Sequence, residues 1–298
     1  MSFMNGGLIM LSEMLPLLPP SEKKIATYII DHPHDSISLT AMELGKRSST
    51  SGAAVMRLCK SLNLKGFQEL KLRIAGDLQK SNDQGFRDIE PNEPALVIIE
   101  KMTSNSIQTM HETAELLNID ELNKAVEALR KARSIHFIGV GASSIIAQDA
   151  QQKFLRIDKT AYAFTDMHVG ATLVANVGEE DVVVGISFSG ETTEVSTMLQ
   201  LANKNKATTI SLTKYGNSIV TDEASIKLYT SATREPTFRS AATSSRMAQL
   251  QVIDILFMTV ASMQYDETVK HLNATRDAVE FLELKKSKKR NGNKKYES

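Results

Sequence analysis

Residues 187–192, with the sequence SFSGET, place three hydroxyl side chains and a glycine at the end of a predicted strand. A helix that begins at such a point presents unpaired N–H groups and the positive end of its dipole, which attract an anion. The hydroxyls of Ser187, Ser189 and Thr192, with the backbone beside Gly190, could bind a phosphate without a cation. Helix capping alone explains one such hydroxyl, but seldom three at one turn. We therefore predict a phosphate-binding turn.

A second turn, residues 139–144 with the sequence GVGASS, follows an earlier predicted strand. It could open a dinucleotide site, and Asp166 lies after the next strand, where an acid that binds the ribose would sit. However, the third position of that motif holds Ser144 instead of glycine or alanine. A tight turn at Gly141 that brings Ser143 to the same ligand as residues 187–192 needs fewer conditions. We favour this interpretation, and a dehydrogenase is the alternative.

Few residues are candidates for catalysis. Proton transfer on a sugar carbon needs a positioned base, and the carboxylates at predicted strand ends are Asp166, Glu191 and Glu235. Glu191 fits a tether for a sugar hydroxyl, and Glu235, in a long loop, could reach the ligand. Nothing in the sequence pairs His136 or His168 with a partner, so both fit surface or packing positions. We expect no catalytic residue, metal site or cofactor, and a phosphosugar isomerase or etherase is the alternative.

The segment from Ser49 to Leu62 has the pattern of a helix that reads DNA. With Val55, Leu58 and Leu62 turned inward, a rotation of about 100° per residue places small and basic side chains outward. Small residues allow close approach to base edges, and N–H groups at the helix start can meet phosphate. The expected DNA contacts are Ser49, Thr50, Ser51, Gly52, Ala53, Met56, Arg57 and Lys60. A unit of three helices could instead serve in dimerisation or docking.

The zero net charge conceals an uneven distribution. The net charge is +3 for residues 1–80, −9 for residues 81–284 and +6 for residues 285–298. Between Thr40 and Arg73, seven basic side chains face two acidic ones. A basic segment in an otherwise acidic chain indicates contact with a polyanion such as DNA. A solvated charged surface is the commoner explanation for such a cluster by itself.

Four helices are predicted in the N-terminal region. After three prolines, Ser21 caps a helix that ends near residue 31. Thr40 and Glu43 form a capping box for the second helix, which turns Met42 and Leu44 toward the core. The third helix begins at residue 50 or 51, and the fourth covers residues 67–78. A polar segment with two prolines, residues 82–94, then marks a domain boundary.

Beyond residue 133 the pattern alternates between β-rich and helical blocks. The predicted strands are residues 135–140, 161–165, 182–187, 208–213 and 226–230, and a last helix from about Thr243 buries Leu250, Ile253, Leu256 and Phe257. Such alternation implies right-handed crossovers and a parallel sheet covered on both faces. The fold class is therefore α/β, with an N-terminal all-α helix-turn-helix domain followed by a doubly wound parallel sheet.

The cellular setting is expected to be the cytoplasm. The single Cys59 excludes an internal disulfide framework. The most apolar stretch, residues 252–262, is much shorter than the roughly 20 residues of a membrane span, so we expect no membrane contact. The lysine-rich end, residues 285–295, cannot bury apolar area and is predicted to be disordered.

Three N-terminal segments resemble the helix-turn-helix signature of RpiR-family regulators: residues 40–44 (TAMEL), 54–62 (AVMRLCKSL) and 64–71 (LKGFQELK). The turns at 187–192 and 139–143 resemble those of a sugar isomerase (SIS) domain, and residues 241–246 (AATSSR) resemble the family pattern before the last helix. Thr50, where the family often has Val, and Ala54, where it often has Ser or Thr, prevent transfer of the base preference. Phe188 stands where SIS enzymes of the aminotransferase type carry Gln.

The resemblance implies a helix-turn-helix domain at residues 1–80, a linker and connecting helix at 81–119, a SIS domain at 120–265 and a C-terminal helix with a basic tail at 266–298. It implies a transcriptional regulator whose affinity for a double-stranded DNA operator is controlled by a sugar phosphate. The branch that responds to N-acetylmuramic acid 6-phosphate is the most similar, so the expected effector is an amino-sugar 6-phosphate. The implied effector contacts are Gly141, Ser143, Ser187, Ser189, Gly190, Glu191, Thr192 and Glu235. We expect a homodimer or homotetramer.

Overall fold

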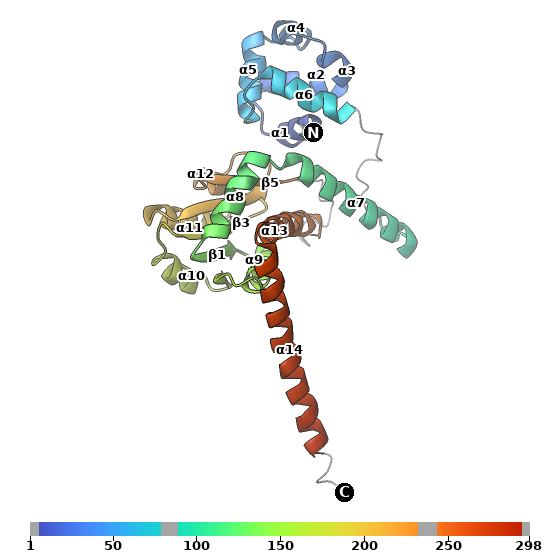
Figure 1. The fold of residues 1–298 in the computed structure, drawn as a ribbon. Coiled ribbons are helices and arrows are strands. Elements are labelled where there is room, and N and C mark those ends of the chain that lie inside the picture. Colours follow the sequence, from blue (N-terminus) through green and yellow to red (C-terminus); the bar gives the residue numbers. More distant parts are fainter. Residues whose placement is uncertain (1–5, 79–88, 232–242, 294–298) are drawn as a thin grey trace.

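The computed structural model describes residues 6–78, 89–231 and 243–293, with side chains as far as Leu282. A helical unit is followed by an α/β unit, from which a long helix leads away (Figure 1). The helical unit comprises α1 (Gly7–Met14), α2 (Pro20–Asp31), α3 (Pro33–Ser36), α4 (Ala41–Arg47), α5 (Gly52–Ser61) and α6 (Phe67–Leu78). Two helices, α7 (Ala95–Leu116) and α8 (Ile119–Lys131), then lead into the sheet.

Local capping sets where the helices of this unit begin. The predicted capping box at α4 is confirmed: Oγ1 of Thr40 accepts from the Glu43 N–H at 3.3 Å, and Oε2 of Glu43 accepts from the Thr40 N–H at 2.8 Å. Ser51 caps α5 by accepting from the Ala54 N–H at 3.2 Å. The predicted cap at Ser21 is wrong. Helix α2 begins at Pro20, whose fixed φ suits the first helical position, where no N–H partner is needed.

One apolar cluster forms the core of the helical unit. Its fully buried members include Leu11, Ile25, Ile29, Leu44, Val55, Leu58, Leu62, Leu70 and Ile74. Helix α1 was not predicted, because the prolines that follow it indicated a break. The prediction that Met42 faces the core is wrong, since its side chain is 78% exposed. Helix α4 instead turns Leu44 and Gly45 inward, and a Cβ on Gly45 would lie 2.4 Å from the backbone of Ser51.

Five parallel strands form the sheet in the order β2-β1-β3-β4-β5. The strands are β1 (Ser134–Gly139), β2 (Ala161–Phe164), β3 (Asp181–Ile186), β4 (Thr208–Lys214) and β5 (Ile226–Thr230). All five lie where the sequence predicts strands, and the predicted parallel α/β fold is confirmed. In the register of β1 with β3, Gly139 pairs with Ile186, so these two strands end side by side.

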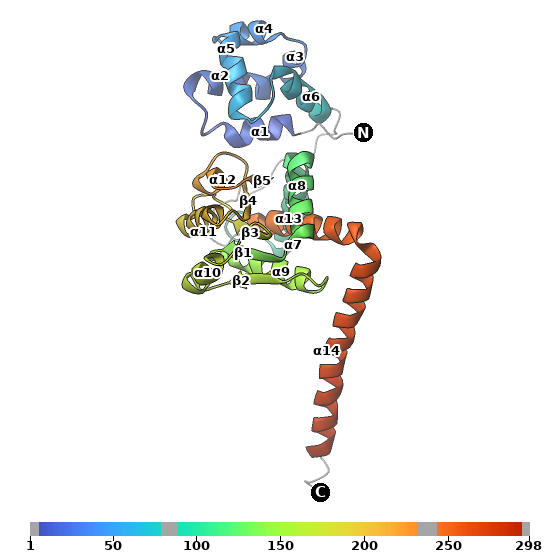
Figure 2. The ribbon, with the colours of Figure 1, turned by 60° about the vertical axis from the view of Figure 1, so that its left-hand side comes forward.

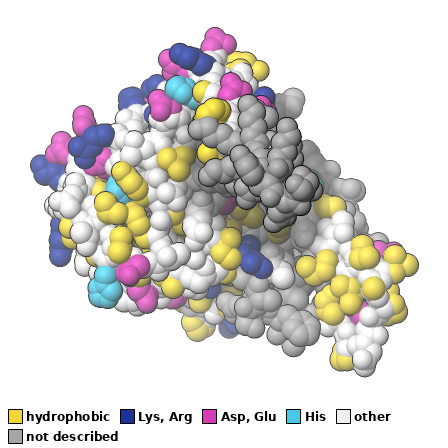
Figure 3. All heavy atoms as spheres, turned by 90° about the horizontal axis from the view of Figure 1, so that it is seen from below, with side chains coloured by type: hydrophobic (Ala, Val, Ile, Leu, Met, Phe, Trp, Pro, Cys, Tyr) yellow, Lys and Arg dark blue, Asp and Glu magenta, His cyan; other side chains and the backbone are white. Residues whose placement is uncertain are grey.

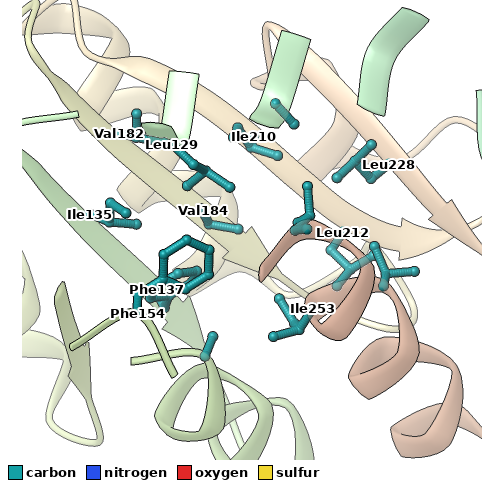
Figure 4. Packing of buried hydrophobic residues seen from close by; sticks show 14 of the residues in the cluster. Leu129, Ile135, Phe137, Phe154, Val182, Val184, Ile210, Leu212, Leu228 and Ile253 are labelled. Atoms are coloured by element: carbon teal, nitrogen blue, oxygen red, sulfur yellow. The ribbon is translucent and has the colours of Figure 1, made fainter. Parts of the chain in front are cut away.

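Helices cover both faces of the sheet. On one face, α8, α9 (Ala142–Leu155) and α13 (Thr243–Met263) pack on side chains such as Phe137 and Val184 (Figure 4). On the other face, α10 (Met167–Val174), α11 (Thr193–Lys204) and α12 (Ile219–Asp222) pack on Ile138 and Val183. Successive strand residues point to opposite faces, so the continuous apolar run of β3 is buried on both sides.

At the amino edge of the sheet, Asp181 is the first residue of β3 and is 1% exposed. Its carboxylate accepts from Nε of Arg133 at 3.0 Å, Oγ of Ser134 at 2.8 Å and the Gly178 N–H at 2.9 Å. Burial by itself would raise the pKa of Asp181, but these donors lower it to about 2. Since Ser134 donates to Asp181, its oxygen accepts from Nε2 of His136, at 2.8 Å. Burial lowers the pKa of His136, which therefore packs as a neutral ring.

Helix α14 (Tyr265–Asn293) runs away from the α/β unit (Figure 2). The predicted disorder from residue 285 differs from the structure, in which the helix continues to Asn293. The prediction rested on charge and neglected the high helix propensity of lysine and arginine, which make up five of residues 285–290. Among the helices of the described ranges, none is long and apolar enough to cross a membrane by itself. Residues 243–263 and 265–282 pass that test only as a pair bent by 112°.

Candidate functional site

The turns after β1 and β3 lie next to each other at the carboxyl edge of the sheet. The chain moves outward from β1 to β2 and then returns to form β3 on the other side of β1. Open α/β sheets bind ligands outside the carboxyl ends of the strands at such a switch in strand order. Because Gly139 pairs with Ile186, residues 140–144 and 187–192 flank this point. The structure therefore brings the two predicted ligand-binding turns together.

The turn from Ser187 to Thr192 is ordered by its own hydroxyls. The side-chain oxygens of Ser187 and Thr192 are 2.7 Å apart, and Oγ of Ser187 accepts from the Gly190 N–H at 3.2 Å. Oγ of Ser189 accepts from the Glu191 N–H at 3.1 Å. Because its oxygen accepts this bond, Ser189 can direct its own proton to an anion at the turn. The arrangement supplies donors of the kind that a phosphate group needs.

The N-terminus of α11 begins directly after this turn. Thr192 occupies the N-cap position and makes no side-chain hydrogen bond to the first turn of the helix. The orphan N–H groups and the helix dipole therefore favour an anion here. Gly190 has a φ of +76°, and a Cβ at this position would lie 2.3 Å from Oγ of Ser218. Both features require glycine, so the turn holds its shape only with this residue.

The turn after β1 is tight for the same reason. A Cβ on Gly139 would lie 2.5 Å from the Ser143 carbonyl oxygen, and Gly141 has a φ of +57°. Ser143 is 7% exposed, and its hydroxyl accepts from Nε2 of Gln249 at 3.3 Å. Oγ of Ser144 donates to the Gly141 carbonyl at 2.7 Å. Gln249 was not predicted, because a lone glutamine inside a long apolar helix carries no local signal.

The carboxylates predicted near the ligand have different surroundings. Oδ1 of Asp166 accepts from the N–H groups of His168 at 2.8 Å and Val169 at 3.3 Å, so Asp166 caps α10. Capping explains this acid without a ribose and weighs against a dehydrogenase. Glu191 is exposed within the turn. Glu235 lies outside the described residues, so its role stays a prediction.

Helix α5 turns the predicted face to solvent. Val55, Leu58 and Leu62 are fully buried. Of the predicted DNA contacts, Ser49, Ser51, Ala53, Met56, Arg57 and Lys60 are exposed, and Thr50 and Gly52 are half-buried. Ser49 turns the chain between α4 and α5 with a φ of 55°. The predicted orientation of the helix is thus confirmed, and the DNA contacts themselves stay a prediction.

Arg57 lies against an acid that sequence analysis did not consider. Its Nε is 3.9 Å from Oε1 of Glu22, and the two side chains are 58% and 6% exposed. Oγ of Ser61 donates to Oε2 of Glu22 at 2.7 Å. The buried carboxylate therefore joins α2 to α5 and orients the arginine, while most of the guanidinium stays in solvent. Glu22 was missed because it lies far upstream of α5 in the sequence.

Helix α2 adds basic side chains beside the start of α5. A surface hollow of about 700 Å³ is lined by α2 and by the turn between α4 and α5, including Lys23, Lys24, Arg47 and Ser49. Nη1 of Arg47 donates to the Tyr28 hydroxyl at 3.3 Å. Two lysines near the N–H groups at the start of α5 extend the positive surface beyond the predicted contacts.

Metal and thiol chemistry find no support in the described ranges. These residues contain no group of three or more His, Cys, Asp or Glu side chains placed to hold a metal ion. Burial raises the pKa of the Cys59 thiol to about 11, so the thiol stays protonated and packs in the core. What the carboxyl edge offers is binding by hydroxyl and amide groups.

Comparisons with known proteins agree with both halves of the structure. The profile of the helix-turn-helix domain of the rpiR family matches residues 5–81, and that of the SIS domain matches residues 128–259. YbbH, an HTH-type transcriptional regulator of Bacillus subtilis, is 50% identical over 281 residues, which are 94% of this chain and 99% of YbbH. This chain belongs to the RpiR family of transcriptional regulators. In this RpiR-family chain, both turns lie within the residues that match the SIS domain, and α5 lies within those that match the helix-turn-helix domain.

Two further relatives extend the comparison of this RpiR-family regulator. An HTH-type transcriptional regulator of Caldanaerobacter subterraneus is 40% identical over 281 residues, which are 94% of this chain and 99% of the relative. The structure of the Vibrio vulnificus NanR protein complexed with ManNAc-6P is similar with a TM-score of 0.59 and 26% identity, over 93% of this chain and 98% of NanR. The RpiR-family regulator thus matches these three proteins over nearly their whole lengths.

Proposed function

We propose that this RpiR-family regulator acts in the cytoplasm and that a phosphorylated amino sugar sets its affinity for a double-stranded DNA operator. The observation that carries the proposal is the meeting of residues 140–144 and 187–192 at the switch in strand order, beside the uncapped first turn of α11. The structure of NanR, which is similar over most of this chain, is of a complex with ManNAc-6P, an amino-sugar phosphate. This similarity supports the same class of effector, including N-acetylmuramic acid 6-phosphate.

The two turns have separate roles in this proposal. The hydroxyls of Ser187, Ser189 and Thr192 and the backbone at Gly190 bind the phosphate. The backbone of Gly141 and the hydroxyl of Ser143 close the site from the β1 side. The exposed carboxylate of Glu191 accepts hydrogen bonds from sugar hydroxyls, as does Glu235.

The outward face of α5 reads the operator. In the major groove, Arg57 and Lys60 reach base edges or phosphates, and Ala53 and Met56 pack against the bases. Of the N–H groups predicted at residues 50–53 to meet phosphate, that of Thr50 donates to the Gly45 carbonyl at 2.7 Å, so those of residues 51–53 contact phosphate at the start of the helix. Lys23 and Lys24 on α2 lie beside this end and bind the neighbouring backbone.

The site senses a sugar phosphate and does not transform it. Isomerisation or ether cleavage needs a base and a proton donor on either side of the reacting carbons. The described residues at the two turns present hydroxyls, backbone N–H groups and the carboxylate of Glu191. An isomerase or etherase is the second candidate, and turnover of a hexose phosphate above about 1 s⁻¹ by the purified protein would establish it.

A thermal-shift screen with three amino-sugar 6-phosphates tests the effector class. N-acetylmuramic acid, N-acetylmannosamine and glucosamine 6-phosphates are compared with the same sugars without phosphate. A ligand that binds the native state raises its stability, so at least one phosphorylated sugar should raise the melting temperature, and the unphosphorylated sugars should not. A gel shift on DNA from upstream of the gene should then change with that sugar. Equal shifts by both sets, or none, would contradict the proposal.

We further propose that the regulator is a homodimer or homotetramer. Exposed apolar side chains gather on the projecting part of α7, among them Leu96 at 67% and Ile99 at 61%, on the right of Figure 3. A second copy is the expected occupant, because helix-turn-helix proteins pair on two half-sites. Light scattering should show a multiple of 32.8 kDa for the wild type and a smaller species for Leu96→Glu with Ile99→Glu. A monomeric wild type would contradict this proposal.

A further inference from the structure

The loop between β4 and α12, residues 215–218, and the last residue of β4, Lys214, contact both candidate sites. On one side, the hydroxyl of Tyr215 donates to the carbonyl of Leu62 at 2.6 Å, and both residues are buried. Leu62 is the C-cap residue of α5, the helix that carries the predicted DNA contacts. One hydrogen bond thus joins the α/β unit directly to the C-terminal end of α5.

The Tyr215 side chain is held firmly in this position. Its ring packs against Tyr229 with 5.0 Å between the ring centroids, and both rings belong to the apolar core of the helical unit. Burial raises the pKa of Tyr215, so the hydroxyl remains a neutral donor at physiological pH. A buried carbonyl that loses its donor is costly, so α5 and this loop are expected to move together.

The same loop is attached to the phosphate-binding turn. The Lys214 N–H donates to the Phe188 carbonyl at 2.9 Å, and the Val220 N–H donates to the Gly190 carbonyl at 3.1 Å. Between these two bonds, Ser218 lies so close to Gly190 that a Cβ on the glycine would meet its Oγ at 2.3 Å. A displacement of Phe188 or Gly190 must therefore move the residues on both sides of Tyr215.

A second contact joins the two units at the neighbouring strand. Oγ of Ser231, directly after β5, donates to Oε2 of Glu112 on α7 at 2.7 Å and lies 3.3 Å from Oε1 of Glu13. Glu13 belongs to α1, and the β4–α12 loop also approaches α1, since a Cβ on Gly216 would lie 3.3 Å from Sδ of Met14. The helix-turn-helix unit therefore rests on the carboxyl edge of β4 and β5, the edge at which the ligand turns lie.

We propose that Tyr215 transmits effector occupancy from the turn at 187–192 to the C-terminal end of α5. This inference rests on the proposed function, because it names the route by which an effector at that turn changes operator affinity. Binding shifts Phe188 and Gly190, the loop follows through its two backbone bonds, and Tyr215 moves the end of α5. The effector can change operator affinity only by as much as its own affinity differs between the two arrangements of the loop and α5.

A double-mutant cycle without ligand tests the route. Operator dissociation constants are measured for the full-length wild type, Gly190→Ala, Tyr215→Phe and the double variant, on DNA that the wild type selects from a random library. Gly190→Ala pushes Ser218 and should change operator affinity about five-fold or more, and Tyr215→Phe should reduce that change to less than about two-fold. In the Tyr229→Phe background the change should persist, because Tyr215 donates the bond to Leu62.

Folding of each variant is checked by circular dichroism. If Gly190→Ala does not fold, Ser218→Thr replaces it, since threonine keeps the capping hydroxyl and adds a methyl group beside Gly190. If the substitution at the turn changed operator affinity equally with and without the Tyr215 hydroxyl, the proposal would be overturned. It would also be overturned if that substitution caused no change in the protein that keeps Tyr215.

A ligand arm separates this inference from the proposed function. Calorimetry with N-acetylmuramic acid 6-phosphate should give Tyr215→Phe a dissociation constant within about two-fold of the wild type, while the effect of the sugar on operator affinity falls at least about five-fold. If the wild type binds no such sugar, the proposed effector is wrong and the ligand-free cycle still decides the route. If the sugar controls operator affinity equally in both proteins, the proposed function stands and Tyr215 is not the route.

Discussion

The two ends of β3 carry similar polar chemistry in opposite arrangements. At the amino edge, Arg133, Ser134 and Gly178 all direct their donors onto the buried carboxylate of Asp181. At the carboxyl edge, the hydroxyls of residues 187–192 accept backbone N–H groups, and the first turn of α11 has no side-chain cap from Thr192. One end therefore satisfies its buried carboxylate internally, and the other keeps donors for an anion.

The comparison shows how one strand can serve both stability and binding. A polar network whose partners are all in the protein stabilises the fold and cannot take a ligand without loss. A helix start with orphan N–H groups tolerates their exposure because water or an anion can satisfy them. We expect substitutions at the amino edge to change stability alone. At the carboxyl edge, we expect substitutions that remove a hydroxyl without displacing the backbone to change ligand affinity alone.

The largest effect is expected at the amino edge. Asp181→Ala removes a buried acceptor from three donors, so the free energy of unfolding should fall by about 2–4 kcal/mol. Urea denaturation measures it. Glu179→Ala is the matched control, because its ion pair with Lys206 is exposed on both sides and should contribute less than about 1 kcal/mol. Equal losses for both variants would contradict the structural role of Asp181.

The next effect concerns the carboxyl edge. Ser189→Ala removes a charge-assisted hydrogen bond to phosphate of about 1.5–3 kcal/mol, so effector affinity should fall about 10- to 150-fold. Calorimetry with the sugar phosphate identified by thermal shift measures it. Operator binding without effector should persist. Thr197→Ala, which removes an exposed hydroxyl later in α11, is the control and should bind effector normally. Normal binding by Ser189→Ala would place the phosphate site elsewhere.

A smaller loss is expected on the helix that rests above this edge. Arg57→Ala should weaken operator binding by about 1–3 kcal/mol and leave effector affinity unchanged, because the guanidinium is mostly exposed on the outward face of α5. The control is Lys206→Ala, which removes an exposed charge from the SIS domain. Gel shifts at one salt concentration measure the operator affinity of both variants. If both substitutions had the same effect, only the total charge of the protein would matter and α5 would not read the operator.

The smallest effect is a pH dependence at the amino edge. The pKa of Asp181 is lowered in the folded state from 3.8 to about 2, so its contribution to stability is complete above the unfolded value and is lost as the pH falls through about 2. Between pH 6 and pH 3, the wild type should lose about 1 kcal/mol more than Asp181→Asn. Urea titrations at both pH values measure this difference. Parallel losses would show that Asp181 does not gain its acidity from folding.

Elements with strong local signals were predictable from the sequence. The capping box at Thr40 and Glu43 and the inward stripe of α5 depend on residues a few positions apart, as does the burial of β3. The meeting of the two turns followed from the general rule for parallel sheets. Fold and site thus came from local spacing combined with topology.

What the sequence could not supply depends on contacts between distant segments. Glu22 lies 39 residues from Ser61, and Tyr215 lies 153 residues from Leu62. Neither pair has a local pattern that would reveal it. The prediction that Met42 faces the core was wrong because Gly45, rather than an apolar periodicity, decides which side of α4 packs against α5. The extension of α14 failed because charge outweighed helix propensity in the prediction.

Reciprocity of binding tests the central claim most directly. The effector dissociation constant is measured by calorimetry with free protein and with protein saturated by operator, and the operator dissociation constant is measured by gel shift with and without saturating effector. If the carboxyl edge and α5 are linked, both constants must change by the same factor, about 5- to 150-fold. An effector that binds with the same affinity to free and operator-bound protein would contradict the account.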